Sequence, residues 1–315
     1  MLPGEGAAPR VLWSEALSPA ERRALLAMSP SRAWLSIGIN WGLVAGAFAL
    51  VAWAPNPLSV VVALFVIGGR QLGFAVLMHE AAHHTLFRNH WLNDVVGNWL
   101  CAYPVWSDLY PYRAYHLQHH AKTGTTEDPD LSLAAPFPVT RASLRRKIWR
   151  DLTGQTGWKR ARATFRRDLG RSQGRVRRLD FTGVRNFRGV TTTNVVLLAV
   201  LTLCGHPALY LLWVAAWLTT YSLVMRIRSI AEHGMVPDQG DDLRNTRTTV
   251  VRWWERLFIA PNCVNYHLEH HLMIAVPHYN LRRMHRLLRD RAALADACVT
   301  RGYLRVLDLA SSRAV

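Results

Sequence analysis

The sequence predicts an all-α, polytopic membrane protein with about four transmembrane helices and a helical cap on the cytoplasmic side. Three observations lead to this fold class: apolar segments long enough to cross a bilayer, a dense basic region between two of them, and histidines grouped at helical spacing. Hydrophobic residues make up 50% of the 315 residues. We expect one domain over residues 1–315, with the cap formed by 79–190 and 228–315.

The apolar segments come in two pairs. Residues 33–54 carry no charge, and a bilayer crossing needs about 20 such residues. The segment 58–78 is also apolar, apart from Arg70. No formal charge occurs between 191 and 225, where Gly205-His206-Pro207 breaks the run. We therefore predict membrane spans at about 33–54, 56–78, 191–205 and 207–227, of which the third is short.

The basic residues indicate how these spans are oriented. Pro55-Asn56-Pro57 and Gly205-His206-Pro207 are expected to form short turns within two helical hairpins. The segment 141–188 between the hairpins contains 16 Lys and Arg residues, opposed by Asp151, Asp168 and Asp180. Because basic loops stay in the cytoplasm, this segment and both termini are predicted to be cytoplasmic. The net charge of +17 is thus assigned to membrane topology and lipid contact, and no nucleic-acid partner is expected.

Three short boxes carry most of the histidine: H-E-A-A-H-H at 79–84, H-L-Q-H-H at 116–120 and H-L-E-H-H at 267–271. Together with His233 they hold ten of the 14 histidines. Imidazole is the commonest metal ligand in proteins and suits iron, zinc and copper. So many imidazoles in matched boxes predict a site that holds more than one metal ion, and the predicted spans bring all ten to the same side of the membrane.

The spacing within the boxes has a geometric meaning. Residues i, i+3 and i+4 share one face of a helix, so each H-x-x-H-H box is expected to aim three nitrogens at one point. In the first box His79 and His83 align, whereas His84 lies off that face. The first box also matches H-E-x-x-H, the signature of zinc metalloproteases. A membrane protease is therefore an alternative, although it gives no reason for the other boxes.

As a set, these motifs resemble the membrane fatty acid desaturase family, part of the larger desaturase–hydroxylase group. The resemblance covers about residues 35–290. It rests on the three boxes and Glu232-His233, and on E-D-P-D-L at 127–131, N-T-R-T at 245–248 and N-Y-H at 265–267. It implies a helical membrane protein with a cytoplasmic cap, a non-haem centre of two iron ions, and O2 as co-substrate.

The resemblance also implies a ligand set. It assigns metal binding to His79, His116, His119, His120, His233, His267, His270 and His271, and leaves open whether His83, His84 or both complete the first box. Some members supply an asparagine where this chain has Ser229. Asn265 either replaces it through a bound water or braces the third box, and we favour bracing.

Ligating histidines usually donate their second N–H to a carboxylate or carbonyl. We expect five residues to hold the outer nitrogens of these histidines or to brace the boxes: Glu80, Glu232, Asn265, Asp128 and Asp130. Glu269 and Asp94 are further candidates. No residue beyond the metal ligands is predicted to act in the chemistry.

The function implied is desaturation of an acyl chain of a fatty acid or lipid by an integral membrane protein. The catalytic face is expected to be cytoplasmic, in a bacterial inner membrane. Electrons would come from an external donor of the ferredoxin or cytochrome b5 type with its reductase. Hydroxylation, or decarboxylation to a terminal alkene, remains an alternative on the same scaffold, and the zinc protease a remote one.

Three residues are candidates for contact with the substrate. An ionisable residue inside an apolar span is costly and often functional, so Arg70 is one candidate for holding a substrate anion, although we favour the plainer explanation that it snorkels or pairs within the cytoplasmic half of the span. Trp106 and Tyr110 lie in an aromatic-rich stretch, which is typical of an interfacial or re-entrant segment or of part of a substrate channel, although we favour plain packing for these side chains.

Overall fold

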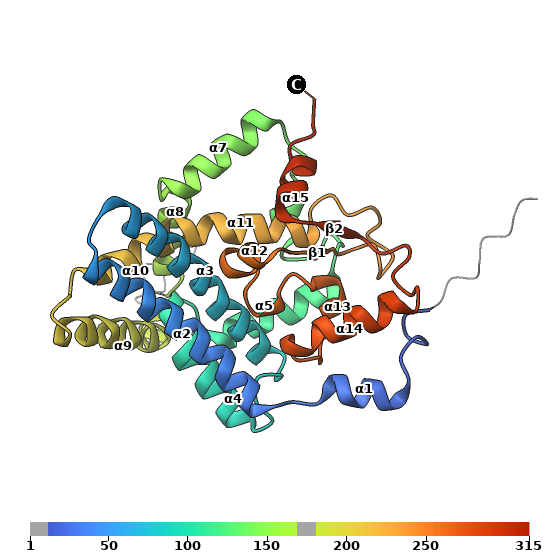
Figure 1. Ribbon diagram of the computed structural model, residues 1–315, viewed down its shortest axis with the longest axis horizontal. Coiled ribbons are helices and arrows are strands. Elements are labelled where there is room, and N and C mark those ends of the chain that lie inside the picture. The colour runs from blue at the N-terminus through green and yellow to red at the C-terminus, as the bar shows by residue number, and fades with distance from the viewer. Residues whose placement is uncertain (1–11, 169–180, 315) are drawn as a thin grey trace, which may run out of the picture.

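The computed structural model describes residues 12–168 and 181–314, and most of them lie in helices, as predicted (Figure 1). Four basic residues of the predicted cytoplasmic loop, together with Asp180, lie outside the described residues: Arg171, Arg175, Arg177 and Arg178. The helices are α1 (Pro19–Leu26), α2 (Pro30–Trp53), α3 (Pro57–Ala82), α4 (His90–Val96), α5 (Leu109–Lys122), α6 (Leu131–Ala134), α7 (Arg141–Leu152), α8 (Gln155–Asp168), α9 (Phe181–Leu203), α10 (Leu209–Leu218), α11 (Thr220–His233), α12 (Trp253–Phe258), α13 (His267–Leu272), α14 (His278–Asp290) and α15 (Tyr303–Ala310). A π-helical segment, Gly97–Ala102, and two 3-10 turns, Tyr103–Val105 and Pro261–Cys263, complete them.

One element was not expected from an all-α prediction. Strands β1 (Thr248–Val250) and β2 (Val299–Arg301) form a two-stranded parallel ladder. Backbone hydrogen bonds join β1 to the third box, because Thr249 N–H donates to the carbonyl of Asn265 at 2.9 Å. On the other side, Arg247 N–H donates to the carbonyl of Glu232, also at 2.9 Å. The ladder thus ties the end of α11 to the start of α13.

Among the described residues, three helices are long and apolar enough to cross a membrane: α2, α3, and the nearly continuous Leu209–His233 formed by α10 and α11. They match the first, second and fourth predicted spans. The third predicted span lies in α9, whose apolar part is the shorter helix Phe187–Leu203. At about 1.5 Å per residue, that part falls short of the hydrocarbon core.

The turn between α2 and α3 is built as its sequence predicts. Pro30 and Pro57 stand in the first turn of their helices, where the missing N–H costs nothing. Asn56 caps α3 by accepting from the N–H of Ser59 at 3.0 Å, and Ser59 reciprocates. The chain reverses over two or three residues, so α2 and α3 pack along each other.

Helix α3 lies at the centre of the fold and contacts α2, α5, α10 and α11 (Figure 1). Glycine permits the closest approaches. A Cβ on Gly68 would lie 2.3 Å from the hydroxyl of Thr220 on α11, and one on Gly97 would lie 2.5 Å from the Cβ of Ala81. The largest apolar core fills the space between α2, α3, α10 and α11.

Arg113 fixes the last turn of α3, where the first histidine box lies. Its guanidinium donates to the carbonyls of Ala81 at 2.8 Å and Ala82 at 3.1 Å. It also pairs with both carboxylate oxygens of Asp94, at 2.5 and 3.1 Å. Since Arg113 is one helical turn before His116 on α5, this contact sets the first and second boxes against each other.

Candidate metal centre

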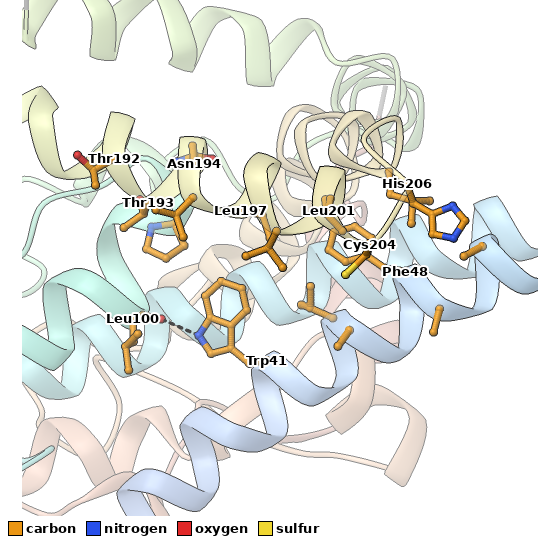
Figure 2. Close-up of a pocket in the computed structure, with 18 of the residues that line it drawn as sticks. Trp41, Phe48, Leu100, Thr192, Thr193, Asn194, Leu197, Leu201, Cys204 and His206 are labelled. Carbon is orange, nitrogen blue, oxygen red and sulfur yellow. Dashed lines mark hydrogen bonds between the residues drawn. The ribbon is translucent and has the colours of Figure 1, made fainter.

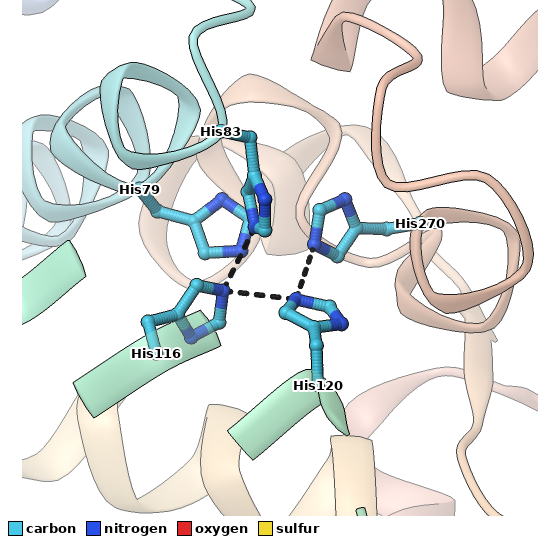
Figure 3. Close-up of side chains that lie close together, drawn as sticks. All are labelled: His79, His83, His116, His120 and His270. Atoms are coloured by element: carbon cyan, nitrogen blue, oxygen red, sulfur yellow. Dashed lines mark hydrogen bonds between the residues drawn. The ribbon is translucent and has the colours of Figure 1, made fainter. Parts of the chain in front are cut away.

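Nine of the ten histidines that the sequence singles out gather in two neighbouring clusters. The ligand nitrogens of each cluster lie within 4.8 Å of one another. Cluster A, drawn in Figure 3, is His79, His83, His116, His120 and His270. Cluster B is His119, His233, His267 and His271. The rings of His120 and His271, one from each cluster, have centroids only 4.3 Å apart.

The two H-x-x-H-H boxes do not each serve one point, contrary to the prediction. On α5 the i, i+4 pair His116 and His120 belongs to cluster A, whereas His119 belongs to cluster B. On α13 the pair His267 and His271 belongs to cluster B. The reason is angular, because residues i+3 and i+4 diverge by about 100° around a helix. The middle histidine of the third box, His270, belongs to cluster A. Each box therefore contributes to both clusters.

The Nε2 atoms of the rings converge. In cluster A, Nε2 of His116 lies 3.0 Å from Nε2 of both His83 and His120. In cluster B, Nε2 of His267 lies 2.8 Å from that of His233 and 3.0 Å from that of His271. A neutral imidazole carries one N–H, so these contacts cannot all be hydrogen bonds.

Among the described residues, five ring nitrogens of these histidines are buried without a hydrogen-bond partner: Nδ1 and Nε2 of His79, Nδ1 of His83, Nε2 of His119 and Nδ1 of His270. An unpaired buried polar atom costs about 1–3 kcal/mol. Convergent lone pairs and unpartnered nitrogens are what a cation would satisfy, so the residues of both clusters fit a metal ion.

Electrostatics keep the rings in the metal-binding form. Burial and the neighbouring His79 lower the pKa of His83 to about 3. Burial and like-charge neighbours also hold the pKa of His116, His267, His270 and His271 well below the usual range. These imidazoles are therefore neutral near pH 7, and neutral imidazole is the form that ligates metals.

His84 belongs to neither cluster. The helix ends at Ala82, and His84 takes a left-handed conformation with φ of 57°. This turns its ring towards His90, with the ring centroids 4.5 Å apart. Its Nδ1 lies 3.9 Å from a carboxylate oxygen of Asp94.

Carboxylates contact the outer nitrogens of the clusters. His119 Nδ1 lies 2.8 Å from Oδ1 of Asp128, and 3.9 Å from Oδ2 of Asp130. Glu80 lies 3.6 Å from Nδ1 of His79, and Glu232 lies 3.6 Å from Nδ1 of His267. Among the described residues, neither Glu269 nor Asp94 lies within 4.0 Å of a ring nitrogen of a cluster histidine.

Sequence reasoning missed a second layer of buried histidines on α14. His278 donates its backbone N–H to Glu80 at 2.8 Å, and Thr85 donates its hydroxyl to the same oxygen at 2.9 Å. His285 Nδ1 lies 2.6 Å from Glu269. His278 and His285 are seven residues apart, so they share one face of α14. That spacing was the signal available in the sequence.

Asn265 and Ser229, the two positions considered for an additional metal ligand, lie in different surroundings. Asn265 donates from Nδ2 to the carbonyl of Thr249 at 2.9 Å, which braces the start of α13, and its Oδ1 is buried without a partner. Ser229 lines a pocket that reaches the clusters.

That pocket, here called the cationic slot, has a volume of about 420 Å³. Its walls come from α5, α7, α8 and α11, and it reaches His116, His119, His233 and His267. Four positive side chains line it, Lys147, Arg160, Arg226 and Arg228, and two carboxylates, Asp130 and Glu232. It is therefore a route to both clusters with a mixed polar and apolar lining.

A larger pocket of about 920 Å³ lies between α2, the π-helical segment, α9 and α10 (Figure 2). Its walls are almost entirely apolar, with Trp41, Phe48 and Leu197 among them. None of the cluster histidines lines it. This apolar pocket suits hydrocarbon, yet it is separate from the metal centre.

A third opening, the apolar mouth, exposes one histidine of each cluster, His120 and His271. Its volume is about 540 Å³. Leu117 of α5 and the segment 272–275 form its apolar rim.

Of the three candidate substrate residues, Arg70 and Tyr110 line none of these openings, and Trp106 lines a separate apolar pocket of about 270 Å³. Arg70 is buried and donates to Oδ1 of Asn40 at 3.4 Å and to the carbonyl of Leu257, which links α2, α3 and α12. Trp106 donates to Asn194 at 3.2 Å, and Tyr110 is exposed. Instead Tyr112 and Tyr115 line the slot.

Comparison with known proteins identifies the family of this chain. The family model for fatty acid desaturases matches residues 52–302. The chain therefore belongs to the fatty acid desaturase family, as its motifs predicted, and membership supports an oxidoreductase.

Curated relatives bear desaturase names. The chain is 28% identical over 278 residues to the dihydrorhizobitoxine desaturase of Bradyrhizobium elkanii, covering 81% of this chain and 74% of the relative. It is 23% identical over 295 residues to an sn-1 oleoyl-lipid 12-desaturase of Picosynechococcus, covering 85% and 80%. An sn-1 acyl-lipid omega-3 desaturase (ferredoxin) of Nostoc is 23% identical over 239 residues, covering 70% and 61%.

Proposed function

We propose that this protein is a membrane di-iron oxidoreductase that uses O2 and external electrons to desaturate an acyl chain of a fatty acid or lipid. The observation that carries the proposal is the pair of adjacent clusters of buried, convergent imidazoles. Cluster A would hold one iron ion and cluster B the other. When bound, the two irons would supply the dioxygen chemistry needed to oxidise an unactivated alkyl chain, which no side chain can perform.

The protein's own residues position these ligands. Asp128 accepts from His119, which fixes the tautomer and leaves Nε2 facing cluster B. Glu80 and Glu232 lie 3.6 Å from Nδ1 of His79 and His267, beyond hydrogen-bond distance, so they act on these two rings through their charge. Because the ligands run from residue 79 to residue 271 and come from α3, α5, α11 and α13, we treat 1–315 as one functional unit.

The zinc protease alternative fits poorly. A zinc protease site has three protein ligands and one open position, whereas cluster A alone offers five nitrogens. The glutamate of H-E-x-x-H must also be free to act as a base. Here Glu80 is buried and accepts from Thr85 and from the backbone of His278.

Hydroxylation and decarboxylation remain alternatives on the same ligand set. They differ from desaturation in how the substrate lies against the clusters. The names of the relatives favour desaturation, and they name two kinds of substrate, dihydrorhizobitoxine and acyl lipids.

We further propose that α9 completes a fourth membrane span and that the histidine clusters face the cytoplasm, in a bacterial inner membrane. Positive-inside bias supports this orientation, since α7 and α8 carry exposed basic residues. Trp149 and Trp158 on the same helices are 65% and 60% exposed. Exposed Trp beside Arg is typical of helices that lie at the membrane interface.

The electron donor is proposed to be an acidic carrier of the ferredoxin type. Arg282, Arg283 and Arg286 form an exposed basic face on α14, directly after the rim of the apolar mouth. Electrostatic complementarity steers such encounters. A cytochrome b5 type donor would use the same charges, and the ferredoxin in the name of the Nostoc relative favours the first.

The proposal is tested by expression of the full chain in a bacterium that lacks desaturases, followed by mass analysis of lipids and acids. Desaturation predicts a product lighter by two hydrogens that appears only with O2 and only with the intact chain. A product heavier by one oxygen would establish hydroxylation. Absence of both, together with absence of iron, would contradict the proposal.

A further inference from the structure

The cationic slot contains two positive side chains that no carboxylate neutralises. Lys147 lies over the ring of Phe137, at 5.8 Å from its centroid. Arg160 lies over Trp217 and Tyr221, at 4.4 and 4.8 Å. Within the described part of the chain, neither has an acidic oxygen within 4.0 Å. These two cations are therefore available to a bound anion.

The other two cations of the slot are already paired. Arg226 makes two contacts with Asp151, at 2.5 and 2.9 Å, and Arg228 contacts Glu232 at 2.6 Å. Burial and repulsion from Arg226 and Arg150 lower the pKa of Lys147, and Asp151 only partly opposes them. A half-buried cation among other cations costs free energy unless an anion joins it.

Arg160 is held ready for such an anion. One Nη atom donates to Ser222 at 3.1 Å and the other to the carbonyl of Trp217 at 2.5 Å, while Nε is buried without a partner. A guanidinium has five N–H donors in a rigid fork, so several remain unused. Thr156 and Ser222 add hydroxyl groups to the same wall.

The opposite end of the slot reaches the metal centre. His116 of cluster A and His119, His233 and His267 of cluster B line it. On α11, Ser222 beside Arg160 and His233 are 11 residues apart, about 16 Å at 1.5 Å per residue. Arg160 and the histidines thus lie towards different ends of one slot, which Lys147 also lines.

Size restricts what can lie between these ends. The slot holds about 420 Å³, within the usual range for small-molecule sites. That is enough for one chain of moderate length and too little for a lipid with two acyl chains. The apolar pocket is larger, but it touches no cluster histidine.

Resting on the proposed function, we propose that the slot binds a single-chain anionic substrate end-on. Lys147 and Arg160 hold its carboxylate or phosphate, and its reacting carbons lie beside the histidine clusters. Because the anion is anchored at a fixed distance from the clusters, the position of reaction is counted from the anionic end. Chains of different length are then altered at the same carbon.

The test measures equilibrium binding to the purified full-length protein in nanodiscs. Three probes share one chain: hexadecanoate, its uncharged methyl ester and hexadecyl phosphate. The variants are Lys147→Gln and Arg160→Gln. The matched controls are Arg146→Gln and Lys159→Gln, which remove one charge from the adjacent exposed position on the same helix.

Hexadecanoate or hexadecyl phosphate should bind at least tenfold more tightly than the ester, and the tighter of the two identifies the anion. Each slot variant should weaken anion binding about tenfold, as expected for one charge-assisted contact. The two controls should stay within about twofold. Equal binding of acid and ester, or equal effects of slot variants and controls, overturns the proposal.

Two further measurements keep the test decisive. If Arg160→Gln disturbs the packing of α8, Arg160→Lys should restore most of the affinity. Lys147→Gln still decides, because Lys147 makes no hydrogen bond or ion pair with the described residues and lies over the ring of Phe137. If phosphatidate, which has two acyl chains, competes for the slot as strongly as hexadecanoate does, the claim that the slot binds a single-chain substrate is overturned. Binding is measured without turnover. If the anionic probes and the ester bind equally while product still forms, only the proposal for the slot is refuted. If product and iron are both absent, the proposed function is refuted.

Discussion

His119 Nδ1 lies 2.8 Å from Oδ1 of Asp128, and both groups are buried. The same carboxylate accepts from the backbone N–H of Gly124 at 3.0 Å and of Asp130 at 2.8 Å. Asp128 therefore shapes the turn after α5 and orients His119 towards cluster B in one contact network.

Asp128→Asn should lower the affinity of cluster B for iron about 10- to 100-fold, the usual cost of losing an outer partner of a ligating histidine. The amide keeps the size of the side chain and weakens the acceptor that fixes the ring. Iron retained during dialysis against graded chelator measures the effect. Glu127→Gln is the control, because Glu127 is exposed and pairs only with Lys122 at 2.7 Å. Equal iron loss in the two variants would contradict this role.

His83 and His84 are adjacent in sequence but should behave differently. His83→Ala removes one nitrogen from cluster A, so the iron content of the purified protein should fall. His84→Ala should leave the iron content unchanged, because the ring of His84 faces His90 instead. Elemental analysis of both variants decides, and iron loss in His84→Ala alone would reverse the assignment.

Asp151 provides a test of stability separate from metal binding. It is fully buried and pairs with Arg226 through two contacts. Asp151→Asn leaves that guanidinium without a charge partner, which should lower the free energy of unfolding by about 3 kcal/mol. Thermal unfolding in detergent measures the loss.

Asp308→Asn is the control for Asp151, because it removes an exposed partner of Arg305 at 2.7 Å. Exposed pairs contribute about 0–1 kcal/mol. A drop in melting temperature as large for Asp308→Asn as for Asp151→Asn would show that the buried pair has no special role.

The basic face of α14 predicts a dependence on salt. Arg282→Glu with Arg286→Glu should raise KM for reduced ferredoxin at least tenfold and leave iron content unchanged, since both side chains are exposed. The wild-type rate should fall as ionic strength rises. Turnover with purified ferredoxin measures both, and a rate insensitive to salt and to the substitutions would exclude this surface as the docking site.

Much of the local structure was predictable from the residues. Proline and asparagine mark the turn before α3, and the spacing of 116–120 and 267–271 places both boxes on helices. Local signals suffice there because capping and helical spacing involve only neighbouring residues.

The partition of each box between two clusters was not predictable. It depends on how α5 lies against α13, which is set by tertiary packing. The contact of His278 with Glu80 joins residues 198 positions apart. Lys147 and Arg160 looked like members of a surface charge run, because periodicity does not reveal that α7 packs on α11 and α8 on α10.

The central claim is that the histidines form two separate iron sites within one chain. Metal analysis of purified protein tests it most directly, with the wild type compared with a His233→Ala, His271→Ala double variant. We predict two irons per chain for the wild type and one for the variant, since cluster A keeps all five nitrogens. A single zinc per chain, or a metal content unchanged by the double substitution, would contradict the account.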